Sequence, residues 1–377
     1  MQVTKVETVK AWVDWCNWLF VRVSTDEGLV GWGEGSLPGA LRAVETNIHE
    51  IGEMLVGEDP AGPERHWHRH YHAWRWRGGA VGMTALSAID LALWDIEGKR
   101  LGVPVHRLLG GAHRTKLRVY ASHWLTGVRT PDAALEGARE ARRRGFTAFK
   151  FIPATYEGLL ADEAGEIALA AELMAAAREG AGPDAEIFIE CAEFFSPRTI
   201  VLLDRALAPY RPGWFEEPLP FENARVMVQA QRTITTPIAT GERLLSRAEF
   251  RELFEGGGCR VAQPDVMHCG GLTEARKIAA YADMHCIAVA PHNPAGPVSC
   301  AATMHLCASI PNFMILEQME DQRAYRDRAS SVPIRLEDGC FVLPDAPGLG
   351  VEPNLDVLAE RPFRAHPIRE RYGALWR

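Results

Sequence analysis

Residues 186–190 read EIFIE, a short run of apolar residues that ends in the carboxylate Glu190. Short runs rich in isoleucine and phenylalanine are typical of buried β-strands. A bare acid at the end of such a strand is costly to bury unless a partner neutralises it. The partner of Glu190 therefore decides what chemistry this end of the strand supports.

The same arrangement occurs twice more along the chain. GWFEE (213–217) carries Glu216 and IATGE (238–242) ends in Glu242, so the three glutamates are 26 residues apart in each case. From about residue 116, strand-like runs start roughly every 25–40 residues with helix-like segments between them, which is the size of a β/α unit. The eight runs are RVYAS (118–122), TAFKF (147–151), EIFIE, GWFEE, IATGE, RVAQPD (260–265), IAVAP (287–291) and FMILE (313–317).

Eight strands with seven intervening helices predict an α/β protein with a (β/α)7β barrel of the TIM type over residues 116–344. A doubly wound open sheet shows the same alternation, so periodicity alone does not exclude it. Residues 1–115 combine a strand-like stretch with two helical patterns and predict a smaller α+β capping domain. The tail, residues 345–377, has little periodicity of its own, and we expect it to complete the capping domain.

The equal spacing predicts that Glu190, Glu216 and Glu242 lie at the same height on three successive strands. Active sites of such barrels lie at the C-terminal ends of the strands. Three adjacent carboxylates in a partly dry pocket cannot all be ionised without a cation. Oxygen ligands alone favour a hard divalent ion, so these glutamates are predicted ligands of Mg²⁺, with Mn²⁺ as a possible substitute. Salt bridges to neighbouring helices are the alternative.

The next two strands end in an aspartate and a histidine. Asp265 lies in QPDVMHCGG and His292 in APHNPAGP. An aspartate that holds one ring nitrogen raises the basicity of the imidazole and leaves the other nitrogen free to take a proton, which predicts a general-base dyad. Glu317 ends the last strand, where it could hydrogen-bond to a developing enolate oxygen.

Composition excludes several classes of function. The net charge is −8 and the chain has no basic run that would indicate nucleic acid binding. No apolar run is long enough to span a bilayer, and no signal peptide is apparent at the N-terminus. The eight cysteines are scattered without a C-x-x-C pair. Buried, reduced thiols in a cytoplasmic protein are therefore expected.

Taken together, these motifs resemble the enolase superfamily, in particular its mandelate racemase subgroup and the sugar-acid dehydratases within it. The resemblance covers nearly the whole chain. It implies that Glu190, Glu216 and Glu242 bind Mg²⁺, that Asp265 and His292 are the general base, and that the fifth acid, Glu317, assists the enolate. The motifs include GWGEG (31–35), SAIDLALWDIEGKRLGVPVHRLLGG (87–111), FEEP (215–218), TGERL (240–244), QPDVMHCGG (263–271), APHNPAGP (290–297) and LEQ (316–318).

Two positions depart from the pattern of the family. Racemases of the family place a K-x-K pair at the end of the second strand, where Lys150 is followed by Ile152. Because isoleucine cannot move a proton, two-base racemisation is disfavoured, and Lys150 is predicted to contact the substrate carboxylate or enolate. Galactonate dehydratase-like members carry a histidine two residues after the first metal ligand, where this chain has Ala192. Glu193 is a candidate replacement for that acid.

Recognition of the substrate is expected from the capping domain and the first barrel strand. Trp18 lies in AWVDWCNWLF, and Trp76 and Arg77 lie in HAWRWRGG. Aromatic faces suit the C–H faces of a sugar, and arginines suit a carboxylate or hydroxyl groups. His123 ends the first barrel strand and is predicted to face the pocket. Core packing between the domains is the alternative for the tryptophans.

The sequence therefore predicts a cytoplasmic, Mg²⁺-dependent lyase that dehydrates a sugar acid, an aldonate or an aldarate, to a 2-keto-3-deoxy acid. A cycloisomerase or epimerase acting on a related acid is the first alternative, and a catalytically inactive binding protein is the second. The resemblance also implies a symmetric homo-oligomer, with no nucleic acid or membrane as a partner.

Overall fold

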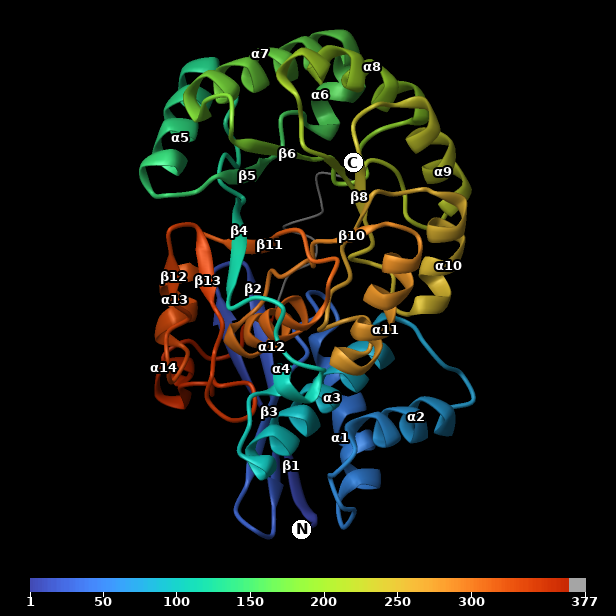
Figure 1. Ribbon diagram of the computed structural model, residues 1–377, viewed down its shortest axis with the longest axis vertical. Coiled ribbons are helices and arrows are strands. Elements are labelled where there is room, and N and C mark those ends of the chain that lie inside the picture. Colours follow the sequence, from blue (N-terminus) through green and yellow to red (C-terminus); the bar gives the residue numbers. More distant parts are fainter. Residues whose placement is uncertain (366–377) are drawn as a thin grey trace.

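A ring of parallel strands forms the centre of the larger part of the protein (Figure 1). The computed structural model describes residues 1–365. Hydrogen bonds join β4 to β10 in chain order. Residues 313–319 complete the ring, because Phe313 bridges Val289 of β10 and Leu316 pairs with Val119 of β4. The strands of the ring are β4 (Lys116–Ser122), β5 (Ala148–Phe151), β6 (Glu186–Glu190), β7 (Phe215–Glu216), β8 (Ile238–Thr240), β9 (Val261–Ala262), β10 (Ala288–Val289) and β11 (Leu316–Met319).

Helices follow the strands and cover the outside of the ring (Figure 1). In the first of them, α5, residues Ala134, Ala138 and Ala141 form a buried stripe with the three- and four-residue spacing of one helix face. The predicted barrel is therefore confirmed. Its helices are α5 (Pro131–Arg143), α6 (Tyr156–Ala161), α7 (Glu163–Ala181), α8 (Pro197–Leu207), the short 3₁₀ helix η1 (Ala208–Tyr210), α9 (Ala224–Thr233), α10 (Arg247–Gly256), α11 (Gly271–Met284) and α12 (Pro297–Ser309).

Large aromatic side chains fill the interior of the ring. Tyr120, Phe188 and Trp214 are fully buried there, and the rings of Phe188 and Trp214 stack with 3.5 Å between their centroids. Small residues on other strands, Ala148 and Ala239, make room for them. Because this layer closes the barrel from within, an open pocket can form only beyond the ends of the strands.

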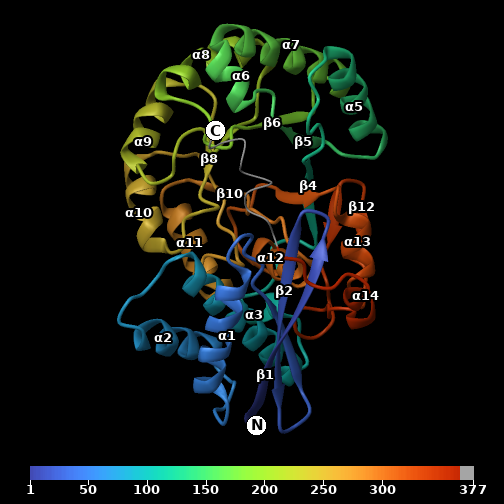
Figure 2. The same cartoon turned by 180° about the vertical axis from the view of Figure 1, so that it is seen from behind.

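The N-terminal residues form an antiparallel three-stranded sheet packed against helices (Figure 2). Its members are β1 (Val3–Val13), β2 (Cys16–Thr25), β3 (Val30–Glu34), α1 (Leu41–Leu55), α2 (Pro63–Ala73), α3 (Ala80–Leu101) and α4 (Val105–Leu108). The predicted α+β capping domain is confirmed, although the sequence pattern does not single out β1.

The last part of the chain returns to the capping domain. The backbone N–H of Trp12 donates to the carbonyl oxygen of Arg361 at 2.7 Å, and the side chain of Asn17 donates to the carbonyl oxygen of Arg364 at 2.8 Å. The predicted tail also includes residues 366–377, which lie outside the described residues, and the predicted domain boundaries stay predictions. The remaining elements are α13 (Arg323–Arg328), β12 (Leu336–Glu337), β13 (Cys340–Val342) and α14 (Leu355–Ala359). Within residues 1–365, no helix combines the length and apolarity needed to cross a membrane.

The close approach of β3 to α3 gives a prediction about stability. A Cβ atom on Gly33 would lie 1.8 Å from the carbonyl oxygen of Ala88, so Gly33→Ala forces the strand and helix apart. We expect a loss of about 2–3 kcal/mol in the free energy of unfolding, measured by denaturant titration. Gly28→Ala is the control, because Gly28 has φ +82° but open space around it, so only backbone strain is added. A Gly33→Ala protein as stable as the native one would contradict the prediction.

Candidate active site

A pocket of about 450 Å³ opens at the C-terminal ends of the barrel strands, under the capping domain. Barrel residues with ionisable side chains lie on one side of it, and Trp15, Trp18 and Ser36 of the capping domain lie on the other. The barrel contributes Lys150, Glu190, Glu242, His292 and Glu317. The pocket is thus built by strand ends that are far apart in the sequence.

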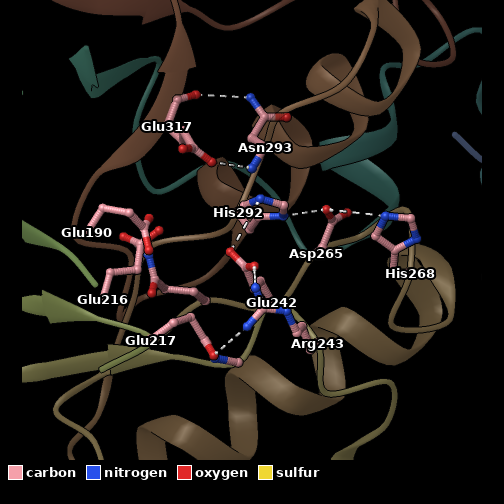
Figure 3. A network of polar contacts seen from close by, with 12 residues as sticks. Glu190, Glu216, Glu217, Glu242, Arg243, Asp265, His268, His292, Asn293 and Glu317 are labelled. Atoms are coloured by element: carbon pink, nitrogen blue, oxygen red, sulfur yellow. Dashed lines mark hydrogen bonds and ion pairs between the residues drawn. The ribbon is translucent and has the colours of Figure 1, made fainter. Parts of the chain in front are cut away.

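Strand register brings the first two glutamates together. Glu190 is the last residue of β6 and pairs with Glu216, the last residue of β7 (Figure 3). The chain turns tightly after Glu190, with Ala192 at φ 46° and Glu193 at φ 62°. This turn lets the backbone N–H of Ala192 donate back to Glu190 Oε1 at 2.9 Å. Two successive non-glycine residues in the left-handed region are strained, which is typical of functional sites.

The ammonium group of Lys150 lies among three carboxylates. Its Nζ is 3.0 Å from Glu190 Oε2 and 3.3 Å from Glu317 Oε1, and it also contacts Glu216 Oε1. Burial alone would lower the pKa of Lys150, but Glu216, Glu317 and Glu190 outweigh it and raise this pKa well above the usual range. Lys150 is therefore a cation in this pocket.

The acids around Lys150 differ in their protonation. Burial raises the pKa of Glu216 well above its usual value, because this side chain is fully buried. Burial acts in the same direction on Glu317, but Lys150 and His292 outweigh it and lower the pKa of Glu317 to about 2. Burial is likewise outweighed at Glu190, where nearby Lys150 lowers the pKa as well, so Glu190 and Glu317 are two ionised carboxylates around one ammonium and leave an excess of negative charge in the pocket.

This donor set fits a divalent cation in its chemistry. Glu190, Glu216 and Glu242 offer the oxygen ligands that Mg²⁺ prefers, and the buried excess of negative charge favours a further cation. Within residues 1–365, however, no three or more aspartate, glutamate, histidine or cysteine side chains are already grouped so that they could hold a metal ion. Glu242 instead approaches Arg243 Nη2 at 3.2 Å, and Lys150 lies against the other two glutamates.

Asp265 and His292 form a hydrogen-bonded pair. His292 Nδ1–H donates to Asp265 Oδ2 at 2.8 Å, and the backbone N–H of Met267 donates to Asp265 Oδ1 at 2.7 Å. His292 Nε2 is left facing the pocket, 3.4 Å from Glu242 Oε2 (Figure 3). Burial lowers the pKa of His292, but Glu242, Asp265 and Glu317 outweigh it and raise this pKa to about 10. The imidazole is thus strongly basic while no cation shares the charge of Glu242.

Asn293 fixes Glu317, the second residue of β11, although the sequence pattern predicts it as the last residue of the strand. The backbone N–H of Asn293 donates to Glu317 Oε2 at 2.8 Å, and its side-chain Nδ2–H donates to the carbonyl oxygen of Glu317 at 3.1 Å. Sequence reasoning missed this residue, although its place directly after His292 puts it at the same barrel mouth. Glu317 is therefore held with one oxygen on Lys150 and the other on the backbone.

The residues predicted to contact substrate fall into two groups. Trp18 and His123 line the pocket. Trp76 does not line it in this chain: its side chain is 89% exposed and borders a separate hollow of about 480 Å³ in the capping domain. The guanidinium of Arg77 lies over the ring of Tyr71, with 5.8 Å to the ring centroid. The fold thus brings only half of this set to the pocket, and substrate contact stays a prediction for all four.

Two polar residues of the pocket wall, Arg243 and His268, are not among the predicted site residues. Arg243 follows Glu242 directly and binds Glu193 Oε1 through Nη1 at 2.7 Å. The carboxylate of Glu193 is therefore paired with this arginine. Glu193, the candidate replacement acid, does not line the pocket. His268 also lines the pocket, three residues after Asp265. The motif TGERL contains Arg243 and the motif QPDVMHCGG contains His268, but only the folded chain shows in which direction the two side chains point.

A closed ring of parallel strands, with acids and a His–Asp pair at its C-terminal mouth and an α+β domain over it, defines the class of capped α/β-barrel enzymes. The chain belongs to the mandelate racemase/muconate lactonizing enzyme family of the enolase superfamily. Residues 5–110 match the model of the N-terminal domain of that family, and residues 133–357 match the enolase C-terminal domain-like model.

Relatives and solved structures agree with this assignment. D-galactonate dehydratase from Pectobacterium atrosepticum is 36% identical, over 100% of this chain and 98% of that protein. D-galactonate dehydratase from Xanthomonas campestris is 38% identical, over 95% of this chain and 94% of that protein. The crystal structure of an enolase superfamily member from Salmonella Typhimurium has a TM-score of 0.90 at 29% identity, covering 96% and 98% of the two chains. An enolase from Agrobacterium radiobacter with bound Na and L-malate has a TM-score of 0.89 at 31% identity, covering 97% and 98%.

Proposed function

We propose that this protein is a Mg²⁺-dependent dehydratase that converts a sugar acid to a 2-keto-3-deoxy acid. One observation carries the proposal: the Asp265–His292 pair, with 2.8 Å between donor and acceptor, faces a pocket whose other strand ends carry an excess of carboxylates. The similarity to D-galactonate dehydratases supports an aldonate as the substrate.

His292 is the proposed base. Asp265 holds Nδ1–H, so Nε2 can take the proton from the carbon next to the substrate carboxylate. When bound by Glu190, Glu216 and Glu242, Mg²⁺ would supply positive charge that stabilises the enolate and lowers the pKa of His292 toward a useful range. Lys150, as a buried cation, is placed to bind the substrate carboxylate or the enolate oxygen.

The same imidazole would return the proton. At the two positions where relatives could place a second proton carrier, this pocket has Ile152 and Ala192. His292 therefore takes the α-proton, the C–O bond at the β-carbon breaks, and the departing hydroxide accepts the proton from His292 and leaves as water. The remaining enol loses its hydroxyl proton, gains a proton at the β-carbon and so becomes the 2-keto-3-deoxy acid. This sequence of steps is a syn elimination.

Three other functions make their own demands on the pocket. An epimerase needs a base on each face of the substrate, and Ile152 disfavours the second base. A cycloisomerase uses the same single base, with an ether oxygen as the leaving group. An inactive binding protein would have no need for buried acids with an excess of negative charge.

A screen of aldonic and aldaric acids with Mg²⁺ tests the proposal. We expect one or a few acids, with D-galactonate among the first to examine, to give a keto product that reacts with semicarbazide. The reaction is repeated in D₂O, where exchange of the α-proton reports on proton abstraction by itself. Epimerisation of an acid without loss of water would show that the protein is an epimerase and not a dehydratase. Absence of both α-proton exchange and product for every acid would contradict enzymatic function.

A further inference from the structure

A row of polar side chains on α3 binds the loop that follows β9. Thr84, Ser87 and Asp90 are buried and spaced three residues apart on a mostly apolar helix. Ser87 Oγ accepts the backbone N–H of Gly270 at 2.8 Å, and Asp90 accepts a backbone N–H in the first turn of α11. Thr84 Oγ1 is 2.8 Å from Nδ1 of His268. The capping domain thereby fixes the direction of the His268 ring.

The second ring nitrogen of His268 faces the pocket. Its Nε2 lies 3.9 Å from Asp265 Oδ2, which is too long for a hydrogen bond. Within the described part of the chain, Nε2 has no other polar contact, and the side chain is 12% exposed where it lines the pocket. Asp265 lies between His268 and His292, so the aspartate is flanked by both imidazoles (Figure 3).

The surroundings of His268 favour one protonation state and one tautomer of its imidazole ring. Burial lowers the pKa of His268 and Asp265 opposes this only in part, so the imidazole is neutral and carries a single N–H. Were this proton on Nδ1, the lone pair of Nε2 would face the carboxylate of Asp265, which repels it. The favoured form has Nδ1 accepting the hydroxyl proton of Thr84 and Nε2–H directed toward Asp265 and the pocket.

We propose that His268 is a specificity-determining residue that donates Nε2–H to a hydroxyl or carboxylate oxygen of the bound sugar acid, and that Thr84 is its positioning residue. The inference rests on the proposed function, because a polyhydroxy acid supplies the oxygen. A donor that stays neutral beside the base binds such an oxygen without exchanging protons with it. Sites that hydrogen-bond a substrate hydroxyl reject analogues that lack it, since the buried polar group is then unpaired.

Steady-state kinetics with Mg²⁺ and D-galactonate test the contact. We expect His268→Ala to raise KM about tenfold or more, as for the loss of one buried hydrogen bond, with a smaller change in kcat. Thr84→Val should raise KM in the same direction, and Thr84→Ser should restore it. Thr46→Val is the matched control, because that hydroxyl donates to its own helix on α1, at the carbonyl oxygen of Arg42.

The ring proton provides a readout that does not depend on turnover. In ¹⁵N-histidine-labelled protein, the signal lost in His268→Gln is assigned to His268 and is expected to show a neutral Nε2–H ring at pH 7, altered by Thr84→Val. A protonated ring, an Nδ1–H ring, or an unchanged KM in an active His268→Ala enzyme would overturn the inference and leave the proposed function intact. A wild-type protein that turns over no sugar acid would instead overturn the proposed function, and the substrate contact with it.

Discussion

In the His292→Asn protein, turnover of a sugar acid is expected to fall about 10³-fold or more. Asparagine can keep a hydrogen bond to Asp265, which His292 makes at 2.8 Å, but it has no group that accepts a proton at neutral pH. General acid–base catalysis by a positioned side chain contributes typically 10²–10⁴-fold, and here one imidazole is asked to take the α-proton and to protonate the leaving hydroxide. The decrease should appear in kcat and in the rate of α-proton exchange in D₂O.

His113→Asn is the matched control for this substitution. His113 is exposed, and its backbone N–H donates to the carbonyl oxygen of Ala308, a bond that the substitution keeps, so the same chemical change should leave turnover unaltered. Thermal unfolding of both variants separates loss of catalysis from loss of structure. An His292→Asn enzyme that exchanges the α-proton at the wild-type rate would remove His292 from the role of base.

The barrel was predictable because each strand is marked twice in the sequence. A short apolar run gives the strand, and the polar residue at its end gives the direction of the active-site face, as for Glu190 and Asp265. The equal spacing of the glutamates correctly predicted that Glu190 and Glu216 lie side by side at adjacent strand ends. The prediction of equal height is wrong for Glu242, which lies beyond the end of β8 at Thr240, because Glu216 pairs with Ala239 instead. In contrast, most residues of β1 are only partly buried, and fully buried residues occur just at Val3, Ala11 and Val13, so its pattern carried little signal.

Other features of the site depend on contacts that no local pattern encodes. The suitability of tryptophan and arginine for sugars predicts a contact for Trp76 and Arg77, but the short segment between α2 and α3 directs Trp76 into solvent. His268 was overlooked because its direction is set by Thr84, which lies 184 residues away in the chain. The contact of Lys150 with Glu317 likewise depends on the closure of the ring, since β5 and β11 lie on either side of β4 but are far apart in the sequence.

Removal of divalent cations is expected to abolish turnover, and Glu216→Gln is expected to weaken Mg²⁺ binding about 100-fold or more. Glu216 is fully buried, and its Oε2 accepts Trp214 Nε1–H at 3.0 Å and Gln263 Nε2–H at 2.8 Å, which fix the carboxylate. Glutamine has one acceptor oxygen and turns an NH₂ group either toward these donors or toward Lys150, so one hydrogen bond or one ligand oxygen is lost. Disturbing even the groups that orient a ligand typically costs 10–100-fold in metal affinity, and loss of the ligand itself should cost more.

Isothermal titration of the EDTA-treated protein with Mg²⁺ measures this affinity without relying on catalysis. Glu222→Gln is the matched control, because Glu222 is exposed on the segment after β7 and the same loss of one negative charge should leave Mg²⁺ affinity unchanged. Turnover of the EDTA-treated enzyme should return on addition of Mg²⁺, and in part with Mn²⁺. Full turnover by protein shown to be metal-free by elemental analysis would contradict a metal at these glutamates, and the stabilisation of the enolate would then fall to Lys150 alone.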